Sequence, residues 1–187
     1  ERYNPVIRNA KKFIDSGEFG NIITLSAKRL SSYPSRIRDV GVLFDLTIHD
    51  VDIMRYLADS KVQSVYATGG NKIDKKYEDY VVLSMEFEND ILGLCETNWL
   101  TPMKVREMCI TTDSVFVNID TIQQKMIVSK SEYGEIDQSN LFQVPINVRE
   151  EDIKFEKEEP LKMELKDFLS SIKNGHEPLV NGIEGLE

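Results

Sequence analysis

The sequence predicts an α+β fold in which helices pack on one face of an open, mostly antiparallel β-sheet. Three segments carry apolar residues at helical spacing, and they flank one run of short segments in which apolar and polar residues alternate. The repeating strand–helix–strand order that builds a parallel, doubly wound sheet is not found in the sequence. Since helices would cover only one face of the predicted sheet, we expect the other face to need a partner.

The first helix is predicted to begin at Asn4-Pro5 and to end near Gly17, because Asn is a good N-cap and Pro suits the first helical position. A short turn follows, and residues 22–30 then alternate as in a strand that leads into an arginine-bearing loop at 31–41. The apolar residues of this helix recur at helical spacing: Val6, Ile7, Ala10, Phe13 and Ile14.

Two further helices are predicted. Residues 45–58 are apolar around most of the helical circumference, so this helix should be largely buried. The last helix begins at Pro160 and ends at Asn174-Gly175, because Gly is favoured just beyond a helix end. The acidic stretch 149–159 before it is predicted to be a solvated connector. Five apolar residues form one stripe on the last helix: Leu161, Leu165, Phe168, Leu169 and Ile172.

The alternating segments between the second and last helices predict a meander of antiparallel strands, since turn-like pairs separate them. These segments are residues 62–68, 80–88, 91–99, 105–112, 115–119, 124–129 and 141–144.

Composition limits the classes of function. A length of 187 residues fits one domain, and a net charge of −9 argues against a general affinity for nucleic acid or anionic membrane. No apolar stretch approaches the roughly 18 to 20 residues of a membrane span. Two cysteines, Cys95 and Cys109, are too few for a disulfide framework, so we expect a reducing, cytoplasmic location. The missing initiator Met suggests a piece of a longer protein, and Leu186-Glu187 could be a cloning scar.

Four polar residues of the second helix fall on one narrow stripe: Asp45, His49, Asp52 and Tyr56. Two interpretations stay open from the stripe alone. In the commoner one, neighbouring backbone satisfies these groups inside the core. In the other, they point into a cleft, where an Asp four residues before a His can hold the tautomer of the ring and raise its basicity for proton transfer.

Other candidate residues are weaker. Arg29, Arg36 and Arg38 flank the loop before the second helix; most surface arginines are solvated, yet three beside a polar stripe could clamp an anionic substrate group. Trp99 could stack on a sugar ring, although a core position is the commoner role for such a residue. We predict no metal site, because the only other histidine, His176, lies far from His49 in the sequence and lacks spaced ligands.

Residues 41–52, Gly-Val-Leu-Phe-Asp-Leu-Thr-Ile-His-Asp-Val-Asp, resemble the signature helix of the glucose-fructose oxidoreductase/inositol dehydrogenase (Gfo/Idh/MocA) family. The family pattern there is Gly-Gly-x-x-x-Asp-x-Gly-x-His-x-hydrophobic-Asp. Val40 and Thr47 depart from it, since they stand where the family often has Gly. Four further segments are similar to family motifs in the expected order: Arg2-Tyr3-Asn4-Pro5, Gly17-Glu18-Phe19-Gly20, Trp99 to Arg106, and Gly182-Ile183-Glu184-Gly185.

The resemblance implies that residues 1–187 form the C-terminal, substrate-binding and dimerisation domain of an enzyme whose Rossmann domain lies upstream. That domain would carry NAD or NADP and a Lys in a Glu-Lys-Pro motif. We expect no cofactor-binding residue in this chain, and therefore no bound cofactor and no activity of the chain alone. By position, Asp45 and His49 match the family's active-site pair and Asp52 matches a later acidic position.

The expected reaction moves a hydride between a sugar, nucleotide-sugar or inositol-like hydroxyl and the nicotinamide. His49 would transfer the proton and Asp45 would orient it, while Arg29, Arg36, Asp52 and Trp99 would contact substrate. Partners are a small sugar or polyol and further copies of the chain, in a homodimer or tetramer through the open sheet face. Two alternatives remain: a non-catalytic sugar-binding or dimerisation module, and an NAD-dependent glycosidase.

Overall fold

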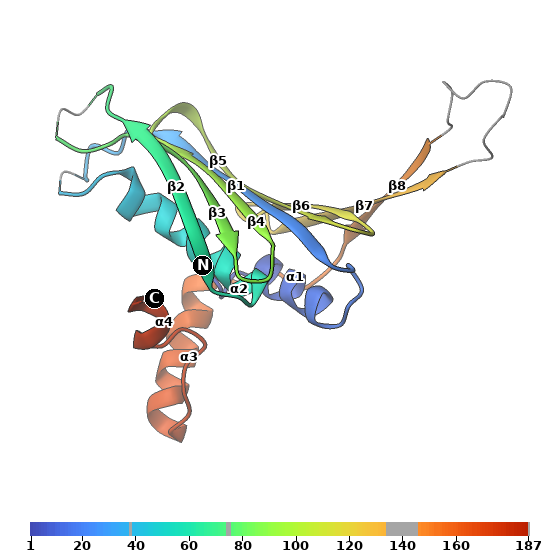
Figure 1. Cartoon of the computed structure of the whole chain (residues 1–187). Helices are drawn as coiled ribbons and strands as arrows, with labels where there is room; N and C mark the ends of the chain where they lie inside the picture. Colours follow the sequence, from blue (N-terminus) through green and yellow to red (C-terminus); the bar gives the residue numbers. More distant parts are fainter. Residues whose placement is uncertain (38, 74–75, 134–145, 187) are drawn as a thin grey trace, which may run out of the picture.

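The fold is a single curved sheet with helices on one face, as the sequence predicts (Figure 1). The computed structural model describes residues 1–37, 39–73, 76–133 and 146–186. Its eight described strands have the order β2-β3-β4-β1-β5-β6-β7-β8. Their bounds are β1 Ile22–Ser32, β2 Val62–Gly70, β3 Tyr80–Phe87, β4 Leu92–Asn98, β5 Leu100–Thr112, β6 Phe116–Asp120, β7 Lys125–Tyr133 and β8 Ile146–Ile153.

The sheet is not the simple meander that the alternation predicts. The first strand, β1, lies in the middle, where it runs parallel to β4 and antiparallel to β5. Every other described neighbouring pair is antiparallel. The local pattern of β1 predicts a strand correctly, but pairing with segments about 70 residues or more downstream depends on the whole fold.

The predicted connector at 149–159 is wrong for its first five residues, because 149–153 belong to β8. This strand lies at the edge of the sheet and is exposed along nearly its whole length. Charged side chains are compatible with an edge strand, where they hinder pairing with other chains, so an acidic composition does not exclude strand structure here. The strand predicted at 141–144 lies outside the described residues.

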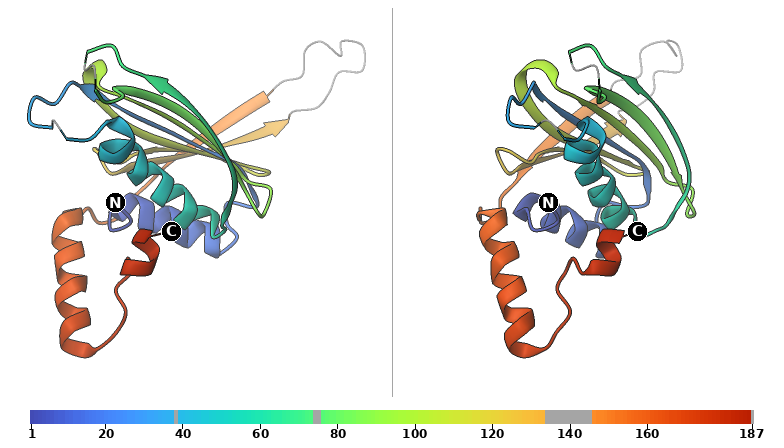
Figure 2. Two further views of the ribbon diagram at one scale, coloured as in Figure 1. Left: turned by 60° about the vertical axis from the view of Figure 1, so that its left-hand side comes forward. Right: turned by 90° about the vertical axis from the view of Figure 1, so that its left-hand side faces the viewer.

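Helix α1, Pro5–Asp15, begins as predicted, with the Asn4 side chain accepting a hydrogen bond from the Val6 amide at 3.2 Å. The predicted helix at 45–58 divides into a π-helical turn, Leu43–Thr47, and the α-helix α2, Ile48–Ala58. Both α1 and α2 lie against the inner face of the sheet (Figure 2). Their apolar side chains and those of the inner face form the main core, which includes Leu25, Ile53, Phe87 and Ile110.

The outer face of the sheet carries apolar side chains that none of the described helices covers. Val82, Leu92 and Leu94 alternate with buried neighbours and are each nearly half exposed. These three side chains therefore point away from the helices.

The last part of the chain stands apart from the sheet. Helix α3, Pro160–Asn174, begins and ends as predicted and is followed by the short α4, Gly182–Leu186. All residues of α3 are described and none is buried, so its apolar stripe faces solvent. Among the described helices, none is long and apolar enough to cross a membrane.

Candidate functional site

A loop from elsewhere in the sequence holds the π-helical turn before α2. The backbone carbonyl of Glu78 accepts a hydrogen bond from the Val42 amide at 2.9 Å, and its Oε1 accepts one from the Leu43 amide at 3.1 Å. A β-carbon at position 41 would collide with the Glu78 carboxylate, so any other residue there would displace this side chain and its bond to the Leu43 amide. Single π-helical turns often occur at functional sites, and this one carries Asp45.

His49 lies in the first turn of α2 and borders a hollow of about 600 Å³ between α2, α3 and α4. Its ring is exposed, and it makes no hydrogen bond or ion pair with the part of the chain that is described. Partial burial against the hollow lowers the pKa of His49 below the ordinary value, and the positive charge of Arg29 adds to this effect. This lowering favours the neutral ring, which is the form that can accept a proton.

A buried ion-pair cluster lies next to His49, between α2 and β1. Arg29 of β1 donates two hydrogen bonds to Asp50 of α2, at 2.9 Å from Nε and 2.8 Å from Nη2, and a third to Glu1 at 2.9 Å. The side chains of Arg29 and Asp50 are only 2% and 6% exposed. Because Asp50 follows His49 in the helix, this cluster fixes α2 against the sheet at the position of the ring.

The two members of this pair affect each other's protonation. Burial alone would lower the pKa of Arg29, but the hydrogen bonds and the charge of Asp50 raise it above the ordinary value. Burial raises the pKa of Asp50, and Arg29 opposes that rise. An arginine stays protonated, so a positive charge persists beside His49 at every pH at which the domain is folded.

The polar stripe does not form one continuous surface. Asp52 borders the same hollow as His49, but it already accepts hydrogen bonds from Arg2, the shortest at 2.7 Å. Arg2 also pairs with Glu184 of α4 at 2.8 Å. Tyr56 lies farther along α2, beneath the guanidinium of Arg2 at 5.2 Å. Asp45 is half-buried and does not line this hollow; its charge acts on Arg106 of β5 instead.

A π-helical turn precedes α2. The stripe was predicted for a regular α-helix over residues 45–58, with about 100° of rotation per residue. The Ile48 amide reaches back five residues to the Leu43 carbonyl, so Asp45 lies in this wider turn and not in the regular helix that carries His49.

Of the remaining predicted substrate contacts, some are buried and one is exposed. Trp99 is 2% exposed and belongs to a small core cluster, where its ring meets Tyr33 edge-to-face at 5.6 Å. Arg36 is exposed in the loop after β1, and Arg38 lies outside the described residues. Arg29 has no surface through which it could contact a substrate. No group of three or more His, Cys, Asp or Glu side chains in the described ranges is placed to hold a metal ion.

Sequence reasoning missed Asp50, Glu1 and Arg106 as parts of this cluster. Arg106 lies 3.4 Å from Glu1 and so extends the cluster across the sheet. The sequence does indicate that Asp50 is paired, because a charged residue that lies off the polar stripe of a buried helix needs a partner of opposite charge. Nothing in the sequence identifies that partner as Arg29.

The lowered pKa of His49 can be measured directly. The chain has only two histidines, so a His176→Gln variant leaves one imidazole signal in a proton NMR titration. We expect its midpoint to lie below 6.5 and to rise in Arg29→Gln, which removes a positive charge and leaves Asp50 uncompensated. A midpoint at or above 6.5 in the folded His176→Gln chain would contradict this.

Comparison with known proteins identifies the family. A family model described as the GFO/IDH/MocA C-terminal domain matches residues 7–114, which is more than half of the chain. The chain belongs to the GFO/IDH/MocA family. The resemblance drawn from the signature helix is thereby confirmed.

Relatives in the GFO/IDH/MocA family match almost the entire chain. A scyllo-inositol 2-dehydrogenase (NAD(+)) from Bacillus subtilis is 27% identical and covers 98% of this chain, which spans 54% of that relative. The solved structure of a UDP-N-acetylglucosamine 3-dehydrogenase from Acidithiobacillus ferrooxidans superposes with a TM-score of 0.79 at 23% identity, covering 98% of this chain and 54% of its own. The chain therefore spans about half the length of the relatives that it matches.

A further solved structure shows the same fold. Levoglucosan dehydrogenase in complex with NADH superposes with a TM-score of 0.76 at 17% identity, and the match covers 98% of this chain and 58% of that one. In the described part of our chain, β1 and β4 form the one parallel pair, and neither leads through a glycine-rich turn into a helix. The described residues thus lack the arrangement that holds a dinucleotide pyrophosphate.

Proposed function

We propose that this chain is the C-terminal, substrate-binding and dimerisation domain of an NAD(P)-dependent oxidoreductase. The hydroxyl that it positions would belong to a sugar, nucleotide sugar or inositol-like polyol. The names of the relatives, which include inositol dehydrogenases and a UDP-N-acetylglucosamine dehydrogenase, support this substrate class. The observation that carries the proposal is an exposed His49 at the wall of a hollow, next in α2 to Asp50, which the buried Arg29 holds in an ion pair.

The chemistry assigned to this chain is proton transfer. A substrate hydroxyl in the hollow donates its hydrogen bond to the free ring nitrogen of His49, and the ring takes the proton as the carbon–hydrogen bond breaks and a carbonyl forms. A nicotinamide held by the rest of the protein supplies the hydride acceptor. The lowered pKa favours the accepting form of the imidazole. Asp45, in the π-helical turn before α2, does not line the hollow and would act on the site only through its charge.

Three of the predicted substrate contacts take positioning roles in this proposal. Arg29 is saturated by Asp50 and Glu1, Asp52 is paired with Arg2, and Trp99 is buried. They hold α2 and the neighbouring loop in place. Arg36 remains exposed, and we keep it as a proposed contact for an anionic group of the substrate.

The test is a turnover screen of the full-length protein against inositols, free sugars and nucleotide sugars, with NAD and NADP in parallel. We expect reduction of one nicotinamide cofactor with at least one of these classes, and loss of that signal in a His49→Gln variant. The absence of cofactor reduction with every class would contradict the proposal.

Because Cys95 and Cys109 are both unpaired, we also propose a cytoplasmic location for the enzyme.

The outer sheet face supports the dimerisation role. Leu94 lies beside Ser84 of β3 and Ser26 of β1, and Tyr66 of β2 continues the same row at 72% exposure. Tyr66, Val82, Leu92 and Leu94 place exposed apolar area on this face, between serines and charged side chains. A second copy can cover it, because the same patch on both subunits gives a closed two-fold contact.

Leu94→Lys is expected to convert the dimer to a monomer, since it places a charge in the middle of this surface without a partner. Ile122→Lys is the matched control, because Ile122 is also 49% exposed but lies in the turn between β6 and β7. Molar mass measured by light scattering should halve in the first variant only. A wild-type chain that is monomeric at high concentration, or equal masses for all three proteins, would contradict this.

A further inference from the structure

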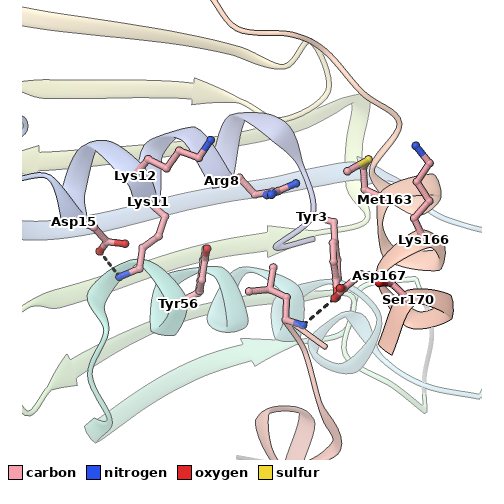
Figure 3. Close-up of a pocket in the computed structure, with 11 residues that line it drawn as sticks. Tyr3, Arg8, Lys11, Lys12, Asp15, Tyr56, Met163, Lys166, Asp167 and Ser170 are labelled. Atoms are coloured by element: carbon pink, nitrogen blue, oxygen red, sulfur yellow. Dashed lines mark hydrogen bonds and ion pairs between the residues drawn. The ribbon is translucent and has the colours of Figure 1, made fainter. Parts of the chain in front are cut away.

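A second hollow, of about 480 Å³, lies between α1, α2 and α3 (Figure 3). It shares only Tyr3 with the residues that line the hollow of His49. Its lining carries four cationic side chains, Arg8, Lys11, Lys12 and Lys166, and two carboxylates. The chain as a whole has a net charge of −9, so this excess of positive charge runs against the overall composition.

The two carboxylates already have partners. Asp15 is paired with Lys11 at 2.8 Å. Asp167 accepts hydrogen bonds from the Tyr3 hydroxyl at 2.7 Å and from the Leu179 amide at 2.9 Å, and these bonds lower its pKa (Figure 3). Within the described part of the chain, Arg8, Lys12 and Lys166 have no ion pair with a carboxylate. Asp167 remains anionic after accepting these hydrogen bonds and offsets part of this charge, so the lining keeps a net positive charge.

The positive charges of α1 are unfavourable for this helix unless an anion is bound beside them. Arg8 lies in the first turn, where the helix dipole disfavours a cation, and this helix has no acidic residue in that turn. Lys11 and Lys12 lie three and four residues after Arg8, so like charges sit on one face of the helix. The side chain of Lys11 is only 12% exposed. Such local conflicts are expected where a site is built for a ligand.

We propose that this hollow binds a phosphoryl-bearing small anion, held by Arg8 and Lys12 of α1 and Lys166 of α3. The Tyr56 hydroxyl is available as a donor at the floor, because burial raises its pKa and keeps it protonated. The volume exceeds that of a bare phosphate, which favours a phosphate ester of a small metabolite. Binding would brace α3 against α1, and Leu165 and Phe168 of α3 line the hollow that contains His49.

The experiment is calorimetric titration of this chain at constant ionic strength with inorganic phosphate, and separately with glucose 6-phosphate. We expect saturable one-to-one binding that weakens as sodium chloride is raised, since salt screens exposed charges. Arg8→Gln and Lys166→Gln should each weaken it about tenfold, because charge-assisted hydrogen bonds are lost. Tighter binding of the ester identifies it as the ligand, whereas equal affinity identifies phosphate itself as the bound group.

Two matched variants separate a site from general attraction. Lys162→Gln removes the same charge from α3, at a residue that does not line the hollow, and should leave the affinity unchanged. Asp15→Asn frees Lys11 and should strengthen binding. Circular dichroism checks that each variant is folded. Equal losses in Lys162→Gln and Lys166→Gln, or no saturable binding of either anion to the wild-type chain, would overturn the proposal.

Discussion

Replacing His49 with Gln in the full-length protein is expected to lower turnover by about 100- to 10,000-fold, the usual contribution of general acid–base catalysis. Stability should change little, because the ring is exposed and makes no hydrogen bond within the described part of the chain. Gln retains hydrogen-bonding groups and similar bulk but cannot accept the proton. The measurement is kcat at saturating substrate, together with the melting temperature.

The second histidine provides a matched control. His176 lies in the turn after α3, where its ring contacts the Ser170 and Ser171 hydroxyls and the Glu177 carbonyl. His176→Gln should leave kcat unchanged. A folded His49→Gln enzyme with normal turnover would instead favour a non-catalytic binding module.

Asp45→Asn tests whether the two active-site candidates act together. If Asp45 tunes the charge around the proton acceptor, Asp45→Asn should lower turnover. The double variant Asp45→Asn/His49→Gln should then show a smaller fold-loss of turnover than the product of the two single fold-losses. The structure shows no direct contact between Asp45 and His49 within the described residues, so coupling must pass through the substrate or the local field. Full independence of the two losses would exclude that coupling.

Breaking the buried Arg29–Asp50 pair is expected to cost about 3–5 kcal/mol of unfolding free energy, because one charge is left buried without its partner. Arg29→Met leaves Asp50 and Glu1 uncompensated behind α2. The double variant Arg29→Met/Asp50→Leu removes both charges. Its loss of unfolding free energy should therefore be smaller than the sum of the losses in Arg29→Met and Asp50→Leu. Urea denaturation of this chain gives the three values.

Lys28→Gln is the control for this series. Lys28 is the neighbour of Arg29 in β1 and pairs with Glu96 at 3.7 Å, with both side chains about half exposed. Such surface pairs contribute about 0–1 kcal/mol, so the variant should unfold almost as the wild type does. Equal destabilisation by Lys28→Gln and Arg29→Met would mean that burial does not explain the contribution of the Arg29–Asp50 pair to stability.

Local patterns in the sequence were sufficient for most of the elements. The cap and apolar spacing of α1, the ends of α3 and the alternation of β3 and β4 are determined by residues close in sequence. The place of β1 in the sheet and the strand β8 were not predicted, because both depend on pairing with distant segments or on an edge position. The signature residues themselves identified the family.

The candidate site was less predictable than the fold. His49 could be found from its place on α2, but the π-helical turn before it depends on Glu78, which comes from a loop more than 30 residues away. The pairing of Arg29 with Asp50 likewise requires the packing of α2 on β1. Each of these features combines residues that no local spacing rule connects.

The central position of β1 also has a consequence for how the chain folds. Residue Ile22 near its start is paired with Thr112 of β5, so the middle of the sheet closes only after some ninety intervening residues are in place. Contacts between residues so far apart in sequence slow folding, because loop entropy is lost before the pairing is gained. During synthesis, β1 must therefore wait with both edges open until β4 and β5 have left the ribosome, and folding of the domain should be slow for its length.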